Sequence, residues 1–310
     1  MKKSKLARLI AAICCFAMLL TACSSNQTPA ESGGDGSTTA DSEKKVLTYA
    51  IGAETTDLST LYMNNSLYCT SKLVYENLVD FDNGEIVPGL AESWEYNDDQ
   101  TELTFHLRQG VTFHNGEPFN AEAVKTNLEH KQSNPSFYSL KGITDIQEIE
   151  VVDEYTITLH YDHPFYAYLQ DFCWPDVNPM SAPEYIIPGD FQTISGVAGT
   201  GPYIYDEYVA GEYTRFVRNE DYWGEAPYWD EIIVKYIPDS TSRLQALQTG
   251  EIDMIYGGTL LTYEEYDQAL AMDGIDGQMA EKDTRVQVIT TNATSPYLSD
   301  IRVRQAIAYA

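Results

Sequence analysis

The sequence predicts an α/β fold, and three patterns lead to that prediction. Residues 232–256 have the pattern of a strand, a helix and a strand, which is the order of a βαβ unit. Apolar and polar side chains alternate over residues 103–108 and again over 155–161, as they do in strands that bury one face. With 310 residues, the chain is long enough for roughly two domains.

The stretch from residue 91 to residue 119 carries the clearest of these patterns. Leucine and phenylalanine occupy every second position of residues 103–107, so one face of this strand should be buried. Residues 111–114 resume the strand pattern after a glycine. Asn120 is then expected to cap a helix over residues 121–131.

Strands and helices alternate along the rest of the chain. Residues 196–202, with three glycines, are expected to form a flexible, hinge-like loop. Asp239 and Ser240 offer an N-terminal cap for a helix that Gly250 ends. Other strands are predicted at 46–52, 252–256 and 286–291 and in the pairs 79–87, 146–161 and 203–218, and other helices at 66–78, 164–172 and 263–272.

The last predicted helix follows Asp300, which is a suitable cap, and runs to the final residue, Ala310. Its apolar residues keep helical spacing up to Ile307, and no glycine, asparagine or proline closes it. This pattern is typical of a helix still in progress. We therefore expect the chain to be part of a longer protein.

Residues 1–22 have the pattern of a secretory signal peptide. Four basic residues precede an apolar run at residues 9–20, which is too short to span a bilayer comfortably. The run ends in Leu-Thr-Ala-Cys, which resembles a bacterial lipobox, where Cys23 would be diacylated and become the mature N-terminus. An ordinary cleavage site followed by a chance cysteine is the alternative. The lipobox interpretation predicts an exported protein that lipid at Cys23 anchors to the membrane.

The composition after the signal segment limits both structure and partners. Residues 24–45 are rich in serine, threonine, glycine and acidic residues, so we predict a flexible, lipidated tether over residues 23–45. The net charge of the chain is -28. Such a surface repels the phosphates of nucleic acids and anionic lipids. We expect no nucleic-acid partner.

Two cysteines remain beyond the signal segment and the lipobox, Cys69 and Cys173. An exported setting permits a disulfide between them. Two separate buried thiols are the alternative, and the sequence leaves both open.

The sequence predicts no catalytic activity, no metal site and no cofactor. Its five histidines lack the spacing of a helical His-x-x-x-His pair, so we interpret them as solvated surface residues. There is neither a Gly-x-Ser-x-Gly nor a His-Glu-x-x-His motif, and residues 196–202 lack the Lys-Ser/Thr of a phosphate loop. The 23 tyrosines suit a wet cleft that holds a polar ligand, although any single tyrosine more often lines the edge of a core.

Seven stretches together resemble the family-5 extracellular solute-binding proteins of ABC importers, the oligopeptide-, dipeptide- and nickel-binding group. They occur in the family's order and cover about residues 46–310. The stretches are 74–78 (VYENL), 88–94, 104–119, 199–203 (GTGPY), 218–224, 250–253 (GEID) and 303–306 (VRQA).

The resemblance implies a periplasmic-binding-protein-like (type II) fold, in which two α/β lobes joined by a hinge close on a ligand. In this group the first lobe carries an extra α+β subdomain. Residues 46–85 and 195–285 would form lobe I, residues 86–194 the extra subdomain, and residues 286–310 the start of an incomplete lobe II.

The implied function is capture of a peptide outside the cytoplasm and its delivery to ABC permease subunits, with a separate ATPase subunit supplying energy. Residues 217–227 look closest to the nickel-binding branch, so a receptor for nickel or a metal chelate is the alternative. A sensory lipoprotein that reuses the fold without transport is an alternative of another class.

The resemblance also implies three ligand-binding residues. Tyr62 matches an early-loop tyrosine of the nickel branch, and Tyr138 approximately matches an aromatic residue before the paired strands. An arginine that holds the carboxylates of a chelate in that branch falls near Asp176 here. An acid at that position would repel a carboxylate-rich chelator and could meet an amine, which favours peptides, whose amino terminus is cationic.

Overall fold

The structure is a computed structural model that describes residues 44–55, 58–60, 69–82, 84–164, 166–174, 178–190, 195–257, 260–278, 295–297 and 299–309. The predicted signal peptide, the lipidation at Cys23 and almost all of the tether lie outside these residues, as does the predicted strand 286–291. None of the helices within the described ranges is long and apolar enough to cross a membrane.

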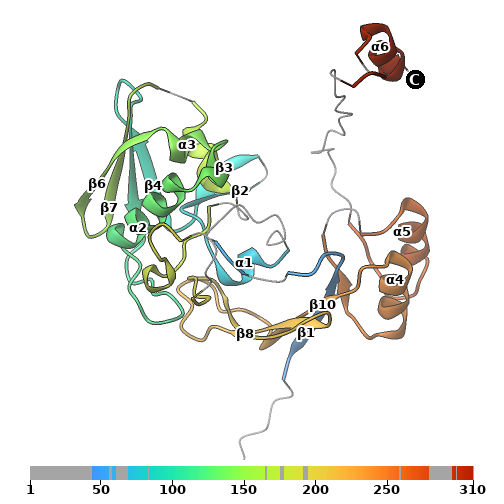
Figure 1. The fold of residues 1–310 in the computed structure, drawn as a ribbon. Coiled ribbons are helices and arrows are strands. Elements are labelled where there is room, and N and C mark those ends of the chain that lie inside the picture. The colour runs from blue at the N-terminus through green and yellow to red at the C-terminus, as the bar shows by residue number, and fades with distance from the viewer. Residues whose placement is uncertain are drawn as a thin grey trace, which may run out of the picture. The chain divides into compact units, whose positions relative to one another are not determined.

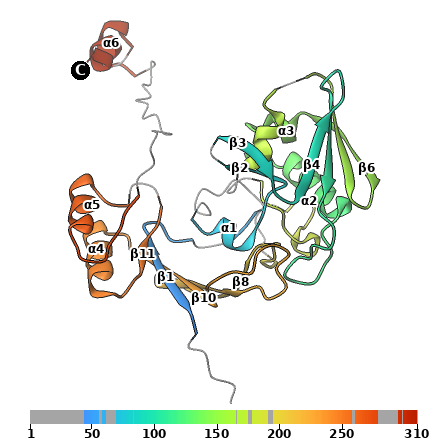
Figure 2. The same ribbon diagram turned by 180° about the vertical axis from the view of Figure 1, so that it is seen from behind.

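A five-stranded mixed sheet has the order β11-β1-β10-β9-β8. Strand β1, the first in the sequence, pairs in parallel with both β10 and β11. Strand β9 runs antiparallel to β10 and to β8. The strands are β1 (Val46–Ile51), β8 (Tyr203–Val209), β9 (Tyr213–Arg218), β10 (Glu231–Tyr236) and β11 (Met254–Ile255). The predicted βαβ unit is confirmed, with β1 inserted between its two strands; Figure 1 labels β1 and β10, and Figure 2 also labels β11.

The helix of this unit, α4 (Ser240–Thr249), begins and ends as its sequence predicts. The Asp239 carboxylate accepts a hydrogen bond of 2.8 Å from the Ser242 amide, which satisfies a free helical N–H. Gly250 ends the helix with a φ of 73°, a left-handed conformation that suits glycine. α4 lies beside α5 (Tyr263–Leu270), which a Thr262–Glu265 capping box starts (Figure 2).

Both faces of the five-stranded sheet are covered, and β1 shows how its sequence achieves this. Tyr49 and Ile51 belong to one buried cluster, together with Phe216 of β9. Ala50 points to the other face and packs with Ala246 of α4. Alternation along the strand thus supplies two separate cores.

A second sheet is wholly antiparallel, with the order β4-β5-β7-β6. Its strands are β4 (Ala91–Tyr96), β5 (Glu102–Leu107), β6 (Ile146–Asp153) and β7 (Thr156–Tyr161). The apolar residues of β5 are buried, as predicted, and helix α2 (Ala121–Ser133) packs on the sheet. The Asn120 side chain caps α2 by accepting a 3.0 Å bond from the Ala123 amide. A two-stranded hairpin, β2 (Val79–Asp82) and β3 (Glu85–Pro88), precedes this sheet, as expected.

The helix predicted at residues 66–78 is wrong in length within the described residues. Helix α1 spans only Ser71–Val74, and Tyr75 is already extended. The carbonyl of Val74 accepts a bond of 2.9 Å from the Gly201 amide instead of continuing a helix. A contact from a distant segment therefore overrides the local helical pattern.

Other boundaries also differ from the prediction. Residues 111–114 form only an isolated bridge between Thr112 and Pro118 rather than a strand. The aromatic segment after Pro164 contains the 3-10 helix η3 (Tyr168–Cys173). Helix α6 (Ile301–Tyr309) is present after Asp300, whose carboxylate accepts a 2.9 Å bond from the Arg302 amide. Cys69 and Cys173 are free thiols, so no disulfide joins them.

The loop expected to be a flexible hinge is instead packed tightly. Residues 198–201 are buried, and the glycines allow close backbone approach. A Cβ on Gly199 would lie 2.0 Å from the carbonyl oxygen of Val74, and one on Gly201 would lie 2.7 Å from that of Leu73. These glycines serve packing against α1, not flexibility.

This packing gives a first prediction. Gly199→Ala should lower the free energy of unfolding by about 3 kcal/mol or more, because its Cβ would collide with backbone that cannot move aside easily. Gly110→Ala is the matched control, since a Cβ there meets open space and costs only about 1 kcal/mol through its positive φ. Urea unfolding of both variants measures the difference, and equal losses would contradict the packing role.

Candidate ligand-binding region

Three of the sequence stretches that carry the family resemblance, 74–78, 199–203 and 218–224, meet at the carboxylate of Glu76. The Tyr222 hydroxyl donates to one of its oxygens at 2.8 Å. Thr200 and Trp223 donate to the other, at 2.8 and 2.7 Å. Burial raises the pKa of Glu76, while these three hydrogen bonds act to lower it.

The same junction connects the two sheets. The backbone carbonyl of Glu76 accepts a 2.9 Å bond from the Met180 amide, and the Arg108 guanidinium lies 4.4 Å from the centre of the Trp223 ring. His114 contacts the glycine loop twice, through its amide to Gly199 and through Nε2 to the carbonyl of Gly201, both at 2.9 Å. We call Glu76 with Thr200, Tyr222 and Trp223 the Glu76 junction.

The histidines are not all surface residues, contrary to the sequence interpretation. His130 is buried, and burial lowers the pKa of the partly buried His114. His106 and His160 lie beside glutamates on the exposed side of the four-stranded sheet, as expected. In the part of the chain that the structure describes, no group of three or more His, Cys, Asp or Glu side chains is placed to hold a metal ion.

Of the three predicted ligand residues, the structure describes only Tyr138; Tyr62 and Asp176 lie outside the described residues. Tyr138 ends the short 3-10 helix η2 (Pro135–Phe137), and 75% of its surface is exposed. It is therefore available to a ligand. The site formed by these three residues stays a prediction.

The elements that flank Tyr138 and Asp176 do pack against each other. Helix α3 (Lys141–Thr144) begins three residues after Tyr138, and η3 ends three residues before Asp176. The Gly142 amide donates to the Asp171 carboxylate at 2.7 Å, and a Cβ on Gly142 would lie 2.5 Å from the carbonyl of Tyr168. We call this contact the α3–η3 corner.

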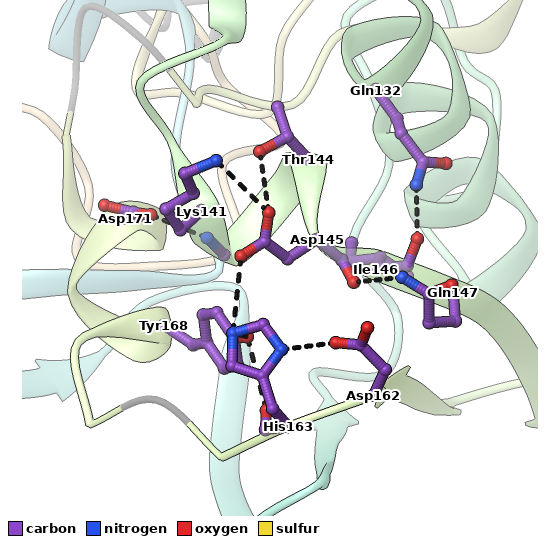
Figure 3. Close-up of polar contacts among 11 residues, drawn as sticks. Gln132, Lys141, Thr144, Asp145, Ile146, Gln147, Asp162, His163, Tyr168 and Asp171 are labelled. Atoms are coloured by element: carbon purple, nitrogen blue, oxygen red, sulfur yellow. Dashed lines mark hydrogen bonds and ion pairs between the residues drawn. The ribbon is translucent and has the colours of Figure 1, made fainter.

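Acidic side chains dominate the α3–η3 corner. Figure 3 shows His163 between Asp145 and Asp162, with the Lys141 ammonium 3.4 Å from the other oxygen of Asp145. Burial raises the pKa of Asp171 at the same corner. No lysine or arginine occurs in the sequence between residues 142 and 214.

The segment after Asp176 is fixed to helix α2 by residues that the sequence interpretation did not single out as functional. We call residues 178–182 the anchored segment. The Asn127 side chain donates to the Ser181 carbonyl at 2.8 Å and accepts from its amide at 2.9 Å. The Lys131 ammonium or amine donates to Asn178 and Pro179. The helical spacing of Val124, Leu128 and Lys131 was the available signal, because it places Lys131 on the inward side.

A hollow of about 1080 Å³ adjoins the β11 edge, and the sequence did not predict it. Apolar and tyrosine side chains provide most of its lining, including Met254, Tyr256, Leu260, Tyr263, Tyr266 and Leu270. It lies next to α5, away from the residues that flank Asp176 in the sequence.

The Glu76 junction gives a second prediction. Glu76→Ala should lower the free energy of unfolding by about 2–4 kcal/mol, because it leaves three partly buried donors without their acceptor. Glu76→Gln should cost much less, since the hydroxyls of Thr200 and Tyr222 can also accept. Because the pKa of Glu76 is raised in the folded state, the free energy of unfolding of wild type should fall as the pH rises through that pKa. Glu76→Gln should lack this fall, because its amide does not titrate. Glu148→Ala, exposed on β6, is the control in urea unfolding between pH 4 and 8; a similar loss there would contradict the role of the junction.

The family described as bacterial extracellular solute-binding proteins, family 5 Middle, matches residues 85–310. The nickel-binding periplasmic protein of Escherichia coli (strain K12) is 33% identical over 259 residues, covering 81% of this chain and 48% of that protein. The chain thus spans about half the length of the curated relatives it matches.

Two solved structures extend the comparison. NikA from Brucella suis, in complex with Fe(III)-EDTA, is 33% identical with a TM-score of 0.67, covering 73% of this chain and 46% of that one. DppA from Helicobacter pylori, in complex with the peptide STSA, is 28% identical with a TM-score of 0.63, covering 74% of this chain and 49% of that one.

Proposed function

Since the chain belongs to the family 5 bacterial extracellular solute-binding proteins and has their mixed α/β, type II periplasmic-binding fold, we propose that it is a receptor of an ABC importer for peptides. Lipid at Cys23 would anchor it outside the cytoplasm, with residues 23–45 as the tether. Residues 46–85 and 195–285 would form lobe I, and residues 86–194 the extra subdomain. Lobe II would begin at residue 286.

The observation that carries the peptide assignment is the charge of the α3–η3 corner. The acids there outnumber Lys141, which is already beside Asp145, and no lysine or arginine follows before residue 215. An acidic wall attracts the ammonium of a peptide and repels the carboxylates of a chelate such as EDTA. Asp176 would then meet the peptide amino terminus, and Tyr62 and Tyr138 would contact the ligand through their rings and hydroxyls.

Transport would proceed by lobe closure. A peptide that contacts both lobes stabilises the closed form by its differential affinity for that form. The closed receptor then docks on the permease, and a separate ATPase subunit supplies the energy. The Glu76 junction supports this mechanism, because it ties the segment that follows Asp176 to the five-stranded sheet through Met180.

A receptor for nickel or a metal chelate is the second candidate. Its support is the 33% identity to the Escherichia coli nickel-binding protein and to the Brucella suis protein that holds Fe(III)-EDTA. A sensory lipoprotein is a candidate of another class. Genes for a permease and an ATPase beside this one would favour import, and a kinase gene would favour sensing.

A ligand screen separates the two transport candidates. We expect dipeptides or oligopeptides to raise the melting temperature, and nickel–histidine to leave it unchanged. Thermal shift is measured on the 310-residue chain and on the longest polypeptide that its gene encodes. Because a closing receptor needs both lobes, the shift should be larger for the longer polypeptide. Stabilisation by the nickel chelate alone would overturn the peptide assignment.

The role of Asp176 can be tested directly. Asp176→Asn should weaken peptide binding about tenfold, because a charge-assisted hydrogen bond to the ammonium is lost. An N-acetylated peptide should bind weakly to wild type and be insensitive to the substitution, because it has no ammonium. Calorimetry compares both peptides, with exposed Asp98→Asn as the control. Equal weakening of both peptides by Asp176→Asn would show that Asp176 does not meet the amino terminus.

A further inference from the structure

Lys131 of helix α2 is buried, and its hydrogen-bond partners within the described part of the chain are uncharged. Only 1% of its surface is exposed. Its Nζ donates to the side-chain oxygen of Asn178 at 3.0 Å and to the carbonyl of Pro179 at 2.7 Å. Among the described residues, no carboxylate forms an ion pair with it.

The partners of Nζ fit an uncharged amine. An ammonium has three donor hydrogens, whereas an amine has two, and the pocket offers two neutral acceptor oxygens. A buried charge without a counter-ion is strongly disfavoured. Consistently, burial lowers the pKa of Lys131 to about 7.

Lys131 holds the anchored segment at its beginning. The backbone amides of that segment bond to different parts of the fold: Asn178 to the carbonyl of Trp174, Met180 to that of Glu76 and Ala182 to that of Ala198. The segment begins two residues after Asp176. Its position therefore determines where the residue proposed to meet the ligand can lie.

We propose that Lys131 is a positioning residue for the ligand-binding region: as an uncharged amine it holds residues 178–182 in place, and its protonation loosens them. This inference rests on the proposed function only in linking the anchored segment to ligand binding through Asp176. Loss of the hold at acid pH would weaken peptide capture without any change at the ligand itself.

Other titratable groups border the anchored segment, and their effects can be separated. The raised pKa values of Glu76 and Asp171 favour the folded state at low pH, which is the opposite sign. The pKa of His114 is lowered from its ordinary value of 6.5, so this histidine changes the pH dependence of stability only below about pH 6.5. Burial raises the pKa of the Cys173 thiol to about 12. His130, the neighbour of Lys131, is also buried, so a variant must isolate the lysine.

The remaining groups come from the elements packed on α2. Lys141 of α3 pairs with Asp145, the residue after that helix, and on η4 (Pro183–Tyr185) there is the exposed Glu184. On β6 the groups are Glu148, Glu150 and Asp153, which are all exposed. On β7, burial raises the pKa of Tyr161 well above 10. All of these groups are still present in a Lys131 variant. A pH effect that wild type shows and the variant lacks is therefore due to Lys131.

The expected sign follows from proton linkage. An unfolded chain keeps the lysine protonated up to about pH 10.4, whereas the folded chain does so only up to about 7. Between these values the unfolded state binds one more proton, so the contribution of Lys131 to stability rises with pH. The unfolding equilibrium constant should fall about tenfold per pH unit from this group in that window.

Amide hydrogen exchange tests the hold without any ligand. After correction for intrinsic rates, we expect the amides of residues 178–182 in wild type to be about thirtyfold more protected at pH 8.5 than at pH 6.0, because the tenfold change per pH unit applies from about pH 7 upward. Lys131→Met should remove the difference, while Lys125→Met, a partly exposed lysine of the same helix, should keep it.

Each outcome decides the proposal. Equal protection of the segment at both pH values in wild type overturns it, and this measurement does not depend on whether a variant folds. A pH difference that persists in Lys131→Met overturns it as well.

Ligand affinity tests the second half of the proposal. The probe is the tetrapeptide Ser-Thr-Ser-Ala, titrated at pH 6.0 and 7.5 into wild type, Lys131→Met and Lys125→Met, all made as the longest polypeptide that the gene encodes. The peptide's own titration is common to all three proteins. We expect affinity to rise severalfold with pH in wild type and Lys125→Met but not in Lys131→Met, and parallel profiles overturn the link to binding. Absence of binding at both pH values contradicts the proposed function, while hydrogen exchange still decides the role of Lys131.

Discussion

The Glu76 carboxylate imposes the main constraint on this structure. Removing a carboxylate from water costs several kcal/mol unless hydrogen bonds replace its hydration. Here the replacements come from Thr200, Tyr222 and Trp223, which lie far from Glu76 in the sequence. The chain must therefore bring three segments to one point before the charge is tolerated. Three other features lie at or next to the same point: the short helix α1, the close approach of Gly199 to Val74, and the stacking of Arg108 on Trp223.

Features set by neighbours in the sequence could be predicted, and features set by distant contacts could not. The alternation in β5, the Asp239 cap and the Gly250 terminus are local, and each is present. The length of α1 depends on Gly201 capturing the carbonyl of Val74, which no local pattern records. The glycines of the loop at residues 196–202 illustrate the same limit. Flexibility and close packing both require glycine, and only the fold shows which one applies.

The same distinction between local patterns and distant contacts applies to the candidate site. Helical spacing placed Lys131 beside Val124 and Leu128, but a lysine at such a position is expected to extend its charge to solvent. Its acceptors lie on a segment that no periodicity connects to α2, so its burial could not be predicted. His114 is partly buried by its contacts with the distant residues Gly199 and Gly201, and His130 is buried on α2. Three further residues were assigned from the family resemblance alone, Tyr62, Tyr138 and Asp176. Their assignment depends on their position relative to the family's motifs, and no local pattern of charge or hydrophobicity indicates them.

The two free thiols affect how the protein can be made and handled. Cys69 and Cys173 are both free in the described fold, and Cys173 is the buried one of the two. Burial that raises the pKa of Cys173 to about 12 leaves almost no thiolate at neutral pH. Alkylating reagents and mixed disulfides should therefore spare this residue while the fold is intact. Its modification would report unfolding of the region around η3, which makes Cys173 a built-in reporter of local structural integrity.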